Sequence, residues 1–188
     1  MHFAARARFS GVAVSLEDSL IRLAVTGDRE AQRLVYESLR DSIGRLVSRI
    51  VDASDVDDVT QDIFLHVFCS LGSFRFESEF TTWVYRLAVH DALHHLRRKR
   101  RRSLVPLENL EMSGRTQQND IENNEILYLA LSKLDPELRV ILHLKEEQEE
   151  CYATIAEILR IPEGTVGSRL NRARRELKKE LLALGWGD

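Results

Sequence analysis

The sequence predicts an all-α protein with two helical domains, and three observations lead to this expectation. Few stretches alternate apolar and polar residues at the period of a β-strand, and Leu, Ala, Arg and Glu, which favour helix, dominate the composition. Glycine and proline are scarce, with nine and three residues among 188. Apolar residues recur every three or four positions on both sides of a polar, net acidic segment, in which this periodicity fails. We therefore expect a loose tail at residues 1–14, domains at residues 15–102 and 125–188, and a flexible acidic linker at residues 103–124.

Two predicted helices open the N-terminal domain. Ser15 is a suitable cap for the first of them, and Gly27 is a residue type that ends helices. Asp28 follows directly and is expected to cap a second, longer helix. Each helix has an inward face of apolar residues at three- and four-residue spacing. These faces comprise Leu16, Leu20, Leu23 and Ala24 in the first helix and Leu34, Val35, Leu39, Ile43, Leu46, Val47 and Ile50 in the second.

A third and a fourth helix complete this domain. The third is predicted to begin near Ser54 and Asp55, where several aspartates suit the positive end of a helix dipole, and to end at Gly72. A short loop leads to Ser78, the expected cap of the fourth helix, which ends in a basic block at residues 97–102. The inward positions are Val56, Val59, Ile63, Phe64, Val67, Phe68 and Leu71 in the third helix and Phe80, Trp83, Val84, Leu87, Ala88 and Leu96 in the fourth.

The C-terminal domain is predicted to contain a helix-turn-helix. A helix at residues 126–134 comes first, and Asp135 and Pro136 then supply a cap and a first-turn proline for the next helix. Residues 152–159 and the residues from Glu163 onward form two further helices around a tight turn, which is helix-turn-helix spacing. The apolar faces comprise Val140, Ile141 and Leu144, then Ile155, Ala156 and Leu159, and finally Val166, Leu170, Ala173 and Leu177.

Charge is strongly segregated along the chain, although the net charge is only −3. Residues 97–102 form an unbroken basic block, and a second basic stretch runs from Arg169 to Lys179. Acidic residues gather elsewhere, for example at residues 55–62 and 146–150. Two separated basic patches on an acidic background suggest a polyanion that is bound at two places. The alternative is that each charge run is an ordinary solvated helix face.

The composition argues against a membrane or secreted protein. No apolar run approaches the ~20 residues that a membrane span needs, and the N-terminus lacks the continuous hydrophobic segment of a secretion signal. Two cysteines cannot form a disulfide framework, so we expect a cytoplasmic protein. Cys69, among apolar residues, is interpreted as a core thiol. Acidic neighbours are expected to raise the pKa of Cys151.

Metal binding and catalysis are not expected either. His90 and His94 lie four residues apart, a spacing that can bind zinc, and His95 is adjacent, but no carboxylate or cysteine completes an obvious ligand set. A polar surface that faces DNA is the preferred interpretation of these histidines. The sequence contains no phosphate-binding glycine loop, nucleophile elbow or metalloprotease motif. We therefore expect no enzyme activity, no metal and no cofactor.

The last predicted helix has a polar face that suits DNA. Hydroxyl and guanidinium groups lie opposite its apolar face, near the start of the helix. In a major groove arginine can pair bidentately with guanine, while the other groups hold phosphates. An ordinary surface helix hairpin with solvated arginines is the alternative. We assign DNA reading to Thr165, Ser168, Arg169, Arg172 and Arg175.

The C-terminal motifs resemble a known family. Residues 134–139, 152–159 and 161–170 read LDPELR, YATIAEIL and IPEGTVGSRL. They are similar to the domain of extracytoplasmic-function (ECF) sigma factors that reads the −35 promoter element. Arg160 stands where this family usually has a glycine in the turn, so a left-handed backbone there would be strained. Gly167 replaces a usual Lys or Arg, which removes a cation and costs about 1 kcal/mol of helix propensity.

The N-terminal domain resembles the same family in two places. Residues 55–64, DVDDVTQDIF, are similar to the sigma helix that docks on core RNA polymerase. An acidic, solvated helix face is the alternative interpretation of this segment. Residues 74–88, FRFESEFTTWVYRLA, resemble the segment that recognises and opens the −10 element. A short loop with a polar rim can hold an extruded base, and the basic helix that follows can track single-strand phosphates.

The resemblance implies two further sets of site residues. Phe76 stands where the family commonly has glycine, and Val89 and His90 replace a frequent Arg-Asn pair. Trp83 is interpreted as a core residue instead of a stacking platform. The expected polymerase-binding residues are Asp58, Gln61, Asp62 and Leu65. The expected −10 residues are Phe74, Arg75, Glu77, Ser78, Tyr85, Arg86, His90, His94, Arg97 and Arg98.

The resemblance implies a sigma factor with three kinds of partner: core RNA polymerase, promoter DNA and an anti-sigma protein. Two alternatives stay open from the sequence. One is a helix-turn-helix repressor or activator that works without polymerase, with the N-terminal domain as a sensor or dimeriser. The other is an interaction protein whose DNA contact has decayed, an alternative that Arg160 and Gly167 favour.

Overall fold

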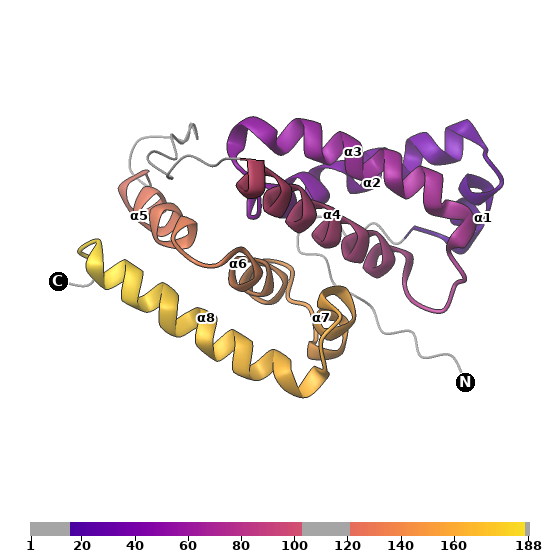
Figure 1. Ribbon diagram of the computed structural model, residues 1–188. Coiled ribbons are helices and arrows are strands. Elements are labelled where there is room, and N and C mark those ends of the chain that lie inside the picture. The colour runs from indigo at the N-terminus through magenta and orange to yellow at the C-terminus, as the bar shows by residue number, and fades with distance from the viewer. Residues whose placement is uncertain (1–15, 103–120, 187–188) are drawn as a thin grey trace.

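The computed structural model describes residues 16–102 and 121–186. These residues form helices and contain no strand, which confirms the predicted all-α class. Figure 1 shows α4 lying between α1 to α3 on one side and α6 to α8 on the other. The elements are α1 (Asp18–Val25), α2 (Arg29–Ser48), η1 (Ala53–Asp55), α3 (Val56–Ser70), η2 (Leu71–Ser73), α4 (Phe80–Arg102), α5 (Ile121–Ser132), α6 (Pro136–Leu142), the π-helical η3 (His143–Glu147), α7 (Tyr152–Leu159) and α8 (Glu163–Ala183).

Two predicted caps are present, and a third is misplaced. The Asp28 carboxylate accepts the N–H of Ala31 at 2.8 Å, and the Asp135 carboxylate accepts that of Glu137 at 2.9 Å, so each side chain satisfies a free donor at a helix start. Helix α4 begins at Phe80, so the prediction of Ser78 as its cap is wrong. The predicted cap Ser15 and almost all of the predicted linker lie outside the described residues.

The predicted apolar faces of α2, α3 and α4 form the core of the first four helices. Val35, Ile43 and Ile63 are completely buried, as are Val84 and Ala88. The inward prediction is wrong for Leu23 and Leu34, which are 52% and 38% exposed. Both lie at the edge of an apolar face, and neither is covered by a neighbouring described helix.

An aromatic cluster closes this core beneath the loop between η2 and α4. The Phe74 ring lies 5.2 Å from the ring of Phe80 and 5.4 Å from that of Trp83, measured between centroids. Trp83 is 7% exposed, which confirms its interpretation as a core residue. The guanidinium of Arg22, from α1, lies 4.2 Å above the ring of Phe76. This cation–π contact ties α1 to the loop.

The C-terminal helices form the predicted helix-turn-helix. Helix α8 packs against α5, α6 and α7. Its residues Val166, Leu170 and Ala173 are fully buried, together with Ile141 of α6 and Ile155 of α7. Since these apolar residues hold one side of α8, its opposite side is left on the surface of the protein.

Both cysteine predictions are wrong. Cys69 is exposed and is not a core thiol, because the apolar face of α3 turns toward α2 and α4 and leaves this position outside. Cys151 is also exposed, and its pKa is lowered instead of raised. The hydroxyl and the backbone N–H of Thr154 hydrogen-bond the sulfur and favour the thiolate, and this outweighs the repulsion from Glu150.

Among the residues that the structure describes, three other than glycine adopt a left-handed backbone. Two of them stand where the resemblance leads us to expect glycine. Arg160, in the turn of the helix-turn-helix, has φ of 53°, and Phe76 has φ of 57°. A side chain in this region costs about 1 to 2 kcal/mol. The prediction of a strained left-handed backbone at Arg160 is therefore confirmed.

Replacing Arg160 by glycine should stabilise the protein by about 0.5 to 1 kcal/mol, because the relief of strain exceeds the entropy that glycine adds to the unfolded chain. Urea unfolding followed by circular dichroism measures the change. Arg160→Ala is the matched control, since it removes the same charge but keeps a Cβ. Equal stability of the two variants would contradict the strain argument.

Candidate nucleic-acid interface

The outer face of α8 carries the residues that are predicted to read DNA. Ser168, Arg172 and Arg175 are exposed, while Thr165 and Arg169 are half-buried. The Ser168 hydroxyl donates to the carbonyl of Thr165 at 2.8 Å. The Arg172 side chain pairs with Glu176 of the same helix at 2.7 Å. The structure therefore brings these predicted residues together on one surface of one helix.

Gly167 lies on the same helix and leaves room for a side chain. A Cβ at this position would approach only the ring of Tyr152, at 3.6 Å, which is an ordinary van der Waals distance. A side chain would therefore fit at this position. Lack of space does not explain why the cation that the resemblance leads us to expect is absent.

The predicted polymerase-binding residues share the outer face of α3. All four are exposed, and Leu65 is 57% exposed, which is unusual for leucine. Val59, Ile63, Phe64 and Val67 are buried on the opposite face, which packs on α2 and α4. The exposed face therefore combines polar or acidic groups with one apolar side chain at helical spacing, and consists of Asp58, Gln61, Asp62 and Leu65.

The predicted −10 residues fall into two groups. Phe74 is 7% exposed within the aromatic cluster and Tyr85 is 1% exposed, so neither side chain reaches solvent in this arrangement. Arg86 and Ser78 are half-buried. The exposed members lie in the loop before α4 and along α4 itself, and comprise Arg75, Glu77, His90, His94, Arg97 and Arg98.

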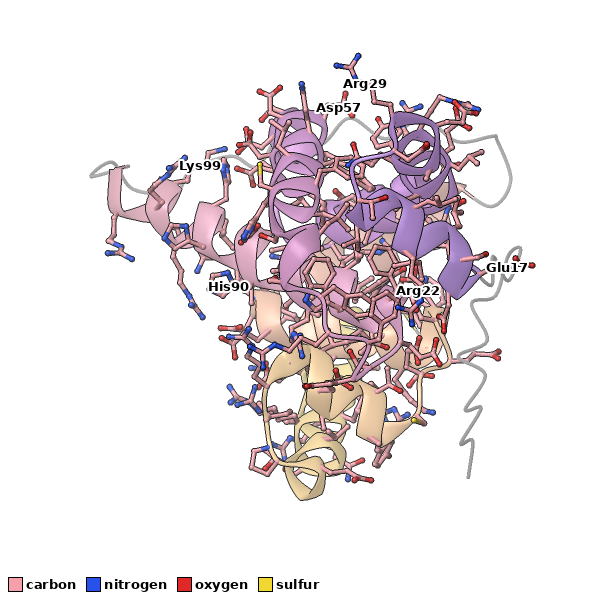
Figure 2. The ribbon with its side chains drawn as sticks, turned by 90° about the vertical axis from the view of Figure 1, so that its right-hand side faces the viewer. Glu17, Arg22, Arg29, Asp57, His90 and Lys99 are labelled. Carbon is pink, nitrogen blue, oxygen red and sulfur yellow. The ribbon has the colours of Figure 1, made fainter. Side chains whose placement is uncertain are left out.

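The basic end of α4 is attached to the start of α3. The Lys99 amine donates to the carboxylates of Asp52 at 2.5 Å and Asp55 at 2.8 Å, and a ring nitrogen of His95 lies 3.1 Å from Asp55. Burial alone would raise the pKa of Asp55, but the hydrogen bonds from Lys99 and His95 bring it below its ordinary value. Figure 2 shows Lys99 and His90 on α4, whose end projects beyond the other helices.

His66 of α3 and His90 of α4 lie beside the carboxylate of Asp91. The Asp91 carboxylate oxygens lie 2.5 Å from Nδ1 of His66 and 3.0 Å from Nδ1 of His90. The rings of His90 and His94 are nearly parallel, with centroids 6.4 Å apart. Within residues 16–102 and 121–186, no three histidine, cysteine or acidic side chains are placed to hold a metal ion.

Comparison with known proteins identifies the family. The family model described as sigma-70 region 2 matches residues 35–102, and the model described as sigma-70, region 4 matches residues 124–177. The ECF RNA polymerase sigma-E factor of Haemophilus influenzae is 31% identical over 182 residues, which cover 89% of this chain and 96% of that protein. The chain belongs to the ECF sigma factors. The sigma-E factor of Escherichia coli K12 is 32% identical over 179 residues, with 88% and 94% covered.

Solved structures share the fold of this sigma factor. The chain of CnrH in complex with the cytosolic domain of CnrY has a TM-score of 0.63 at 23% identity, with 88% of this chain and 96% of that chain covered. The sigma factor RpoE in complex with the anti-sigma factor NepR from Bartonella quintana has a TM-score of 0.69 at 19% identity, with 79% and 95% covered.

Family membership decides between the functions that the sequence left open. A sigma factor is a DNA-binding transcription initiation factor and not an enzyme. The similarity to named sigma factors spans both domains, so a repressor or activator that works without polymerase is not favoured. None of the described helices of this sigma factor is long and apolar enough to cross a membrane.

Sequence reasoning missed the residues of this sigma factor that join its two halves. The Glu137 carboxylate, on α6, pairs with Arg97 of α4 at 2.9 Å and with Arg169 of α8 at 3.3 Å. Glu157 of α7 pairs with Arg86 of α4 at 3.3 Å. No local signal could reveal these pairs, because the partners on α4 lie 40 and 71 positions away in the chain.

Proposed function

We propose that this sigma factor binds core RNA polymerase through α3 and reads the −10 and −35 promoter elements with α4 and α8. The names of the two sigma-E relatives include RNA polymerase, and the cytoplasm, where that enzyme works, is the proposed location. The observation that carries the proposal is the pair of matches to region 2 and region 4 in one chain, each on helices with an exposed polar face.

Helix α8 suits the reading of duplex DNA at the −35 element. Its buried residues fix the helix against α6 and α7, and the hydroxyl and guanidinium groups of Ser168 and Arg172 are exposed on the other side. A rigid helix that presents such groups can enter a major groove and combine base contacts with phosphate contacts. Arg169 and Arg175 would add phosphate contacts beside them.

Helix α4 and the loop before it suit single-stranded DNA at the −10 element. The loop exposes Arg75 and Glu77 as a polar rim, and the basic end of α4 exposes Arg97 and Arg98. Such a surface can hold an extruded base at the rim and the phosphates that follow along the helix.

An anti-sigma protein is proposed as a third partner. CnrH and RpoE, which share this fold, are recorded in complexes with CnrY and with the anti-sigma factor NepR. Co-purification of this chain from its native cell, followed by mass spectrometry, would identify such a protein.

Run-off transcription with bacterial core polymerase tests the proposed function. We expect the chain to direct transcripts from a subset of promoters in a genomic fragment library that core enzyme alone does not transcribe. The absence of any transcript that depends on this chain would overturn the proposal. A gel shift without polymerase distinguishes the repressor alternative, which requires tight specific binding by the free protein.

Leu65→Ala should weaken core-polymerase binding about tenfold, because an apolar side chain at the centre of an interface contributes on the order of 1 to 2 kcal/mol. Fluorescence anisotropy with labelled chain and unlabelled core enzyme measures the affinity. Leu34→Ala is the matched control, since Leu34 is also an exposed leucine but lies on α2. Equal affinity of the two variants would remove α3 from the proposed interface.

A further inference from the structure

Four of the six histidines of this sigma factor lie on α3 and α4. Among them, His66 of α3 and His90 of α4 share the carboxylate of Asp91, with Nδ1–O distances of 2.5 Å and 3.0 Å. The two imidazole side chains are 44% and 62% exposed, whereas the Asp91 side chain is 24% exposed. The carboxylate is therefore partly covered, while a ligand can reach both rings.

The shared carboxylate determines how these two rings can act. An ionised carboxylate only accepts hydrogen bonds, so Nδ1 of each ring carries the proton that faces Asp91. Nε2 is then the atom of each ring that can meet a ligand, as an acceptor in the neutral ring and as a donor in the protonated one. One carboxylate with two neutral rings has a net charge of −1, and protonation of both rings changes this charge to +1. The cluster therefore repels an anion at high pH and attracts it at low pH.

The ring of His94 extends this cluster along α4. Its plane is 6° from that of His90, and the two ring centroids are 6.4 Å apart. His90 and His94 are exposed, as are Arg97 and Arg98 in the following turn. Positions that are three or four residues apart share one face of a helix. The two rings therefore precede the basic end of α4 on the same face, and a strand that follows this helix would pass them (Figure 2).

Charged groups from the neighbouring elements surround these rings. A hollow between α3 and α4 brings together Asp62, Asp91, His94, His95 and Arg98. Toward α2, α6 and α7, the charged groups near α4 form pairs with one another, namely Arg49 with Glu147, Arg97 with Glu137 and Arg86 with Glu157. Carboxylates and guanidinium groups keep their charge near neutral pH, whereas histidine has an ordinary pKa of about 6.5. The rings are therefore the groups of this hollow whose charge responds to pH.

We propose that His90 and His94 form a proton-linked phosphate site, positioned by Asp91, which makes the affinity for single-stranded DNA rise as the pH falls. The proposal rests on the proposed function, because it requires α4 to lie along the −10 strand. A phosphate beside the rings stabilises their protonated form, so binding takes up protons, and by linkage a lower pH favours binding. Arginine and lysine contacts stay charged over this range and produce no such dependence.

Fluorescence anisotropy with a labelled mixed-sequence single-stranded oligonucleotide tests the site in the full chain bound to core RNA polymerase. At constant ionic strength, we expect the wild-type complex to bind about fivefold more tightly at about pH 6 than at about pH 8. The double variant His90→Gln with His94→Gln should change its affinity by less than about twofold over the same range, because glutamine does not titrate. Both positions are exposed, so these variants should keep the fold.

His95→Gln is the matched control. His95 lies on the same helix, but its ring is held by the carboxylate of Asp55 at 3.1 Å, so the pH dependence of binding should persist in this variant. Burial raises the pKa of Glu150 to about 7, but this carboxyl is present in every variant. Its titration therefore cannot produce a difference between the double variant and the control.

Asp91→Asn tests the positioning role of the carboxylate. The amide keeps the shape of the side chain but removes the negative charge that stabilises a protonated His90 ring. We expect the midpoint of the pH dependence to move to lower pH. An equal loss of affinity at every pH, with an unmoved midpoint, would overturn the positioning role.

Three results would each overturn the inference: a wild-type affinity that does not change with pH, an unchanged pH dependence in the double variant, or its loss in His95→Gln. If the wild-type complex still directs run-off transcription, the inference alone fails and the proposed function stands. If this complex binds the oligonucleotide no better than core enzyme alone at any pH, the assignment of DNA binding to α4 fails as well.

Discussion

Leu170→Ala is expected to lower the free energy of unfolding by about 3 kcal/mol. Leu170 is completely buried in α8, on the side that packs against the neighbouring helices. Truncation of a fully buried leucine removes its transfer free energy and leaves a cavity, for a combined loss of about 2 to 5 kcal/mol. The midpoint of urea unfolding, followed by circular dichroism, measures the change.

The control for this variant is Leu182→Ala, because Leu182 lies on the same helix but is 57% exposed. We expect that substitution to change the free energy of unfolding by less than about 0.5 kcal/mol. Equal losses in the two variants would mean that α8 is not held by its buried face. In that case the outward orientation of Ser168 and Arg172 would also lose its structural basis.

Glu150→Gln is expected to stabilise the protein by up to about 3 kcal/mol above pH 7, and to leave its stability almost unchanged near pH 4.5. Glu150 is 4% exposed, and burial raises the pKa of its carboxyl from the ordinary 4.5 to about 7, against the opposing charge of Lys145. Because the folded-state pKa is raised, the folded protein holds this proton more tightly than the unfolded chain does.

The sign of the pH dependence follows from this difference. The stabilising contribution of protonated Glu150 is fully present below about pH 4.5 and is lost as the pH rises through about 7. Glutamine is neutral throughout, so the variant should lack this loss. Urea unfolding at pH 5, 6, 7 and 8 measures the two profiles, with the exposed neighbour in Glu149→Gln as control. Parallel profiles for wild type and Glu150→Gln would contradict the assignment.

Much of the fold could be predicted because its signals are local. Asp28 and Asp135 cap the helices that they were expected to cap, and the three- and four-residue periodicity selected the buried faces of α2, α3 and α8. The errors at Leu23 and Leu34 occur where an apolar residue lies at the edge of such a face. Periodicity identifies the face, but only the size of the covering neighbour decides whether its edge is buried.

The candidate site could be predicted in part. The outer faces of α3 and α8 are exposed as their spacing indicated, because a helix with one buried side must expose the other. The same reasoning could not recognise that Tyr85 is buried or that Arg86 and Arg97 are paired. It also could not find the left-handed backbone at Phe76, although the resemblance marks that position as a usual glycine.

By itself, the sequence determined the helices, the caps Asp28 and Asp135, the main polar and apolar faces and the family of the chain. Each of these signals lies within a few consecutive residues or one continuous motif. The tertiary structure alone decided which polar groups stay free. Arg49, Arg86 and Arg97 form ion pairs with carboxylates that lie 98, 71 and 40 positions away in the chain. Glu150 is buried by residues that no local sequence pattern identifies. Contacts between residues so far apart in the chain depend on how two complete surfaces dock. Docking is set by the shape and charge of both surfaces together.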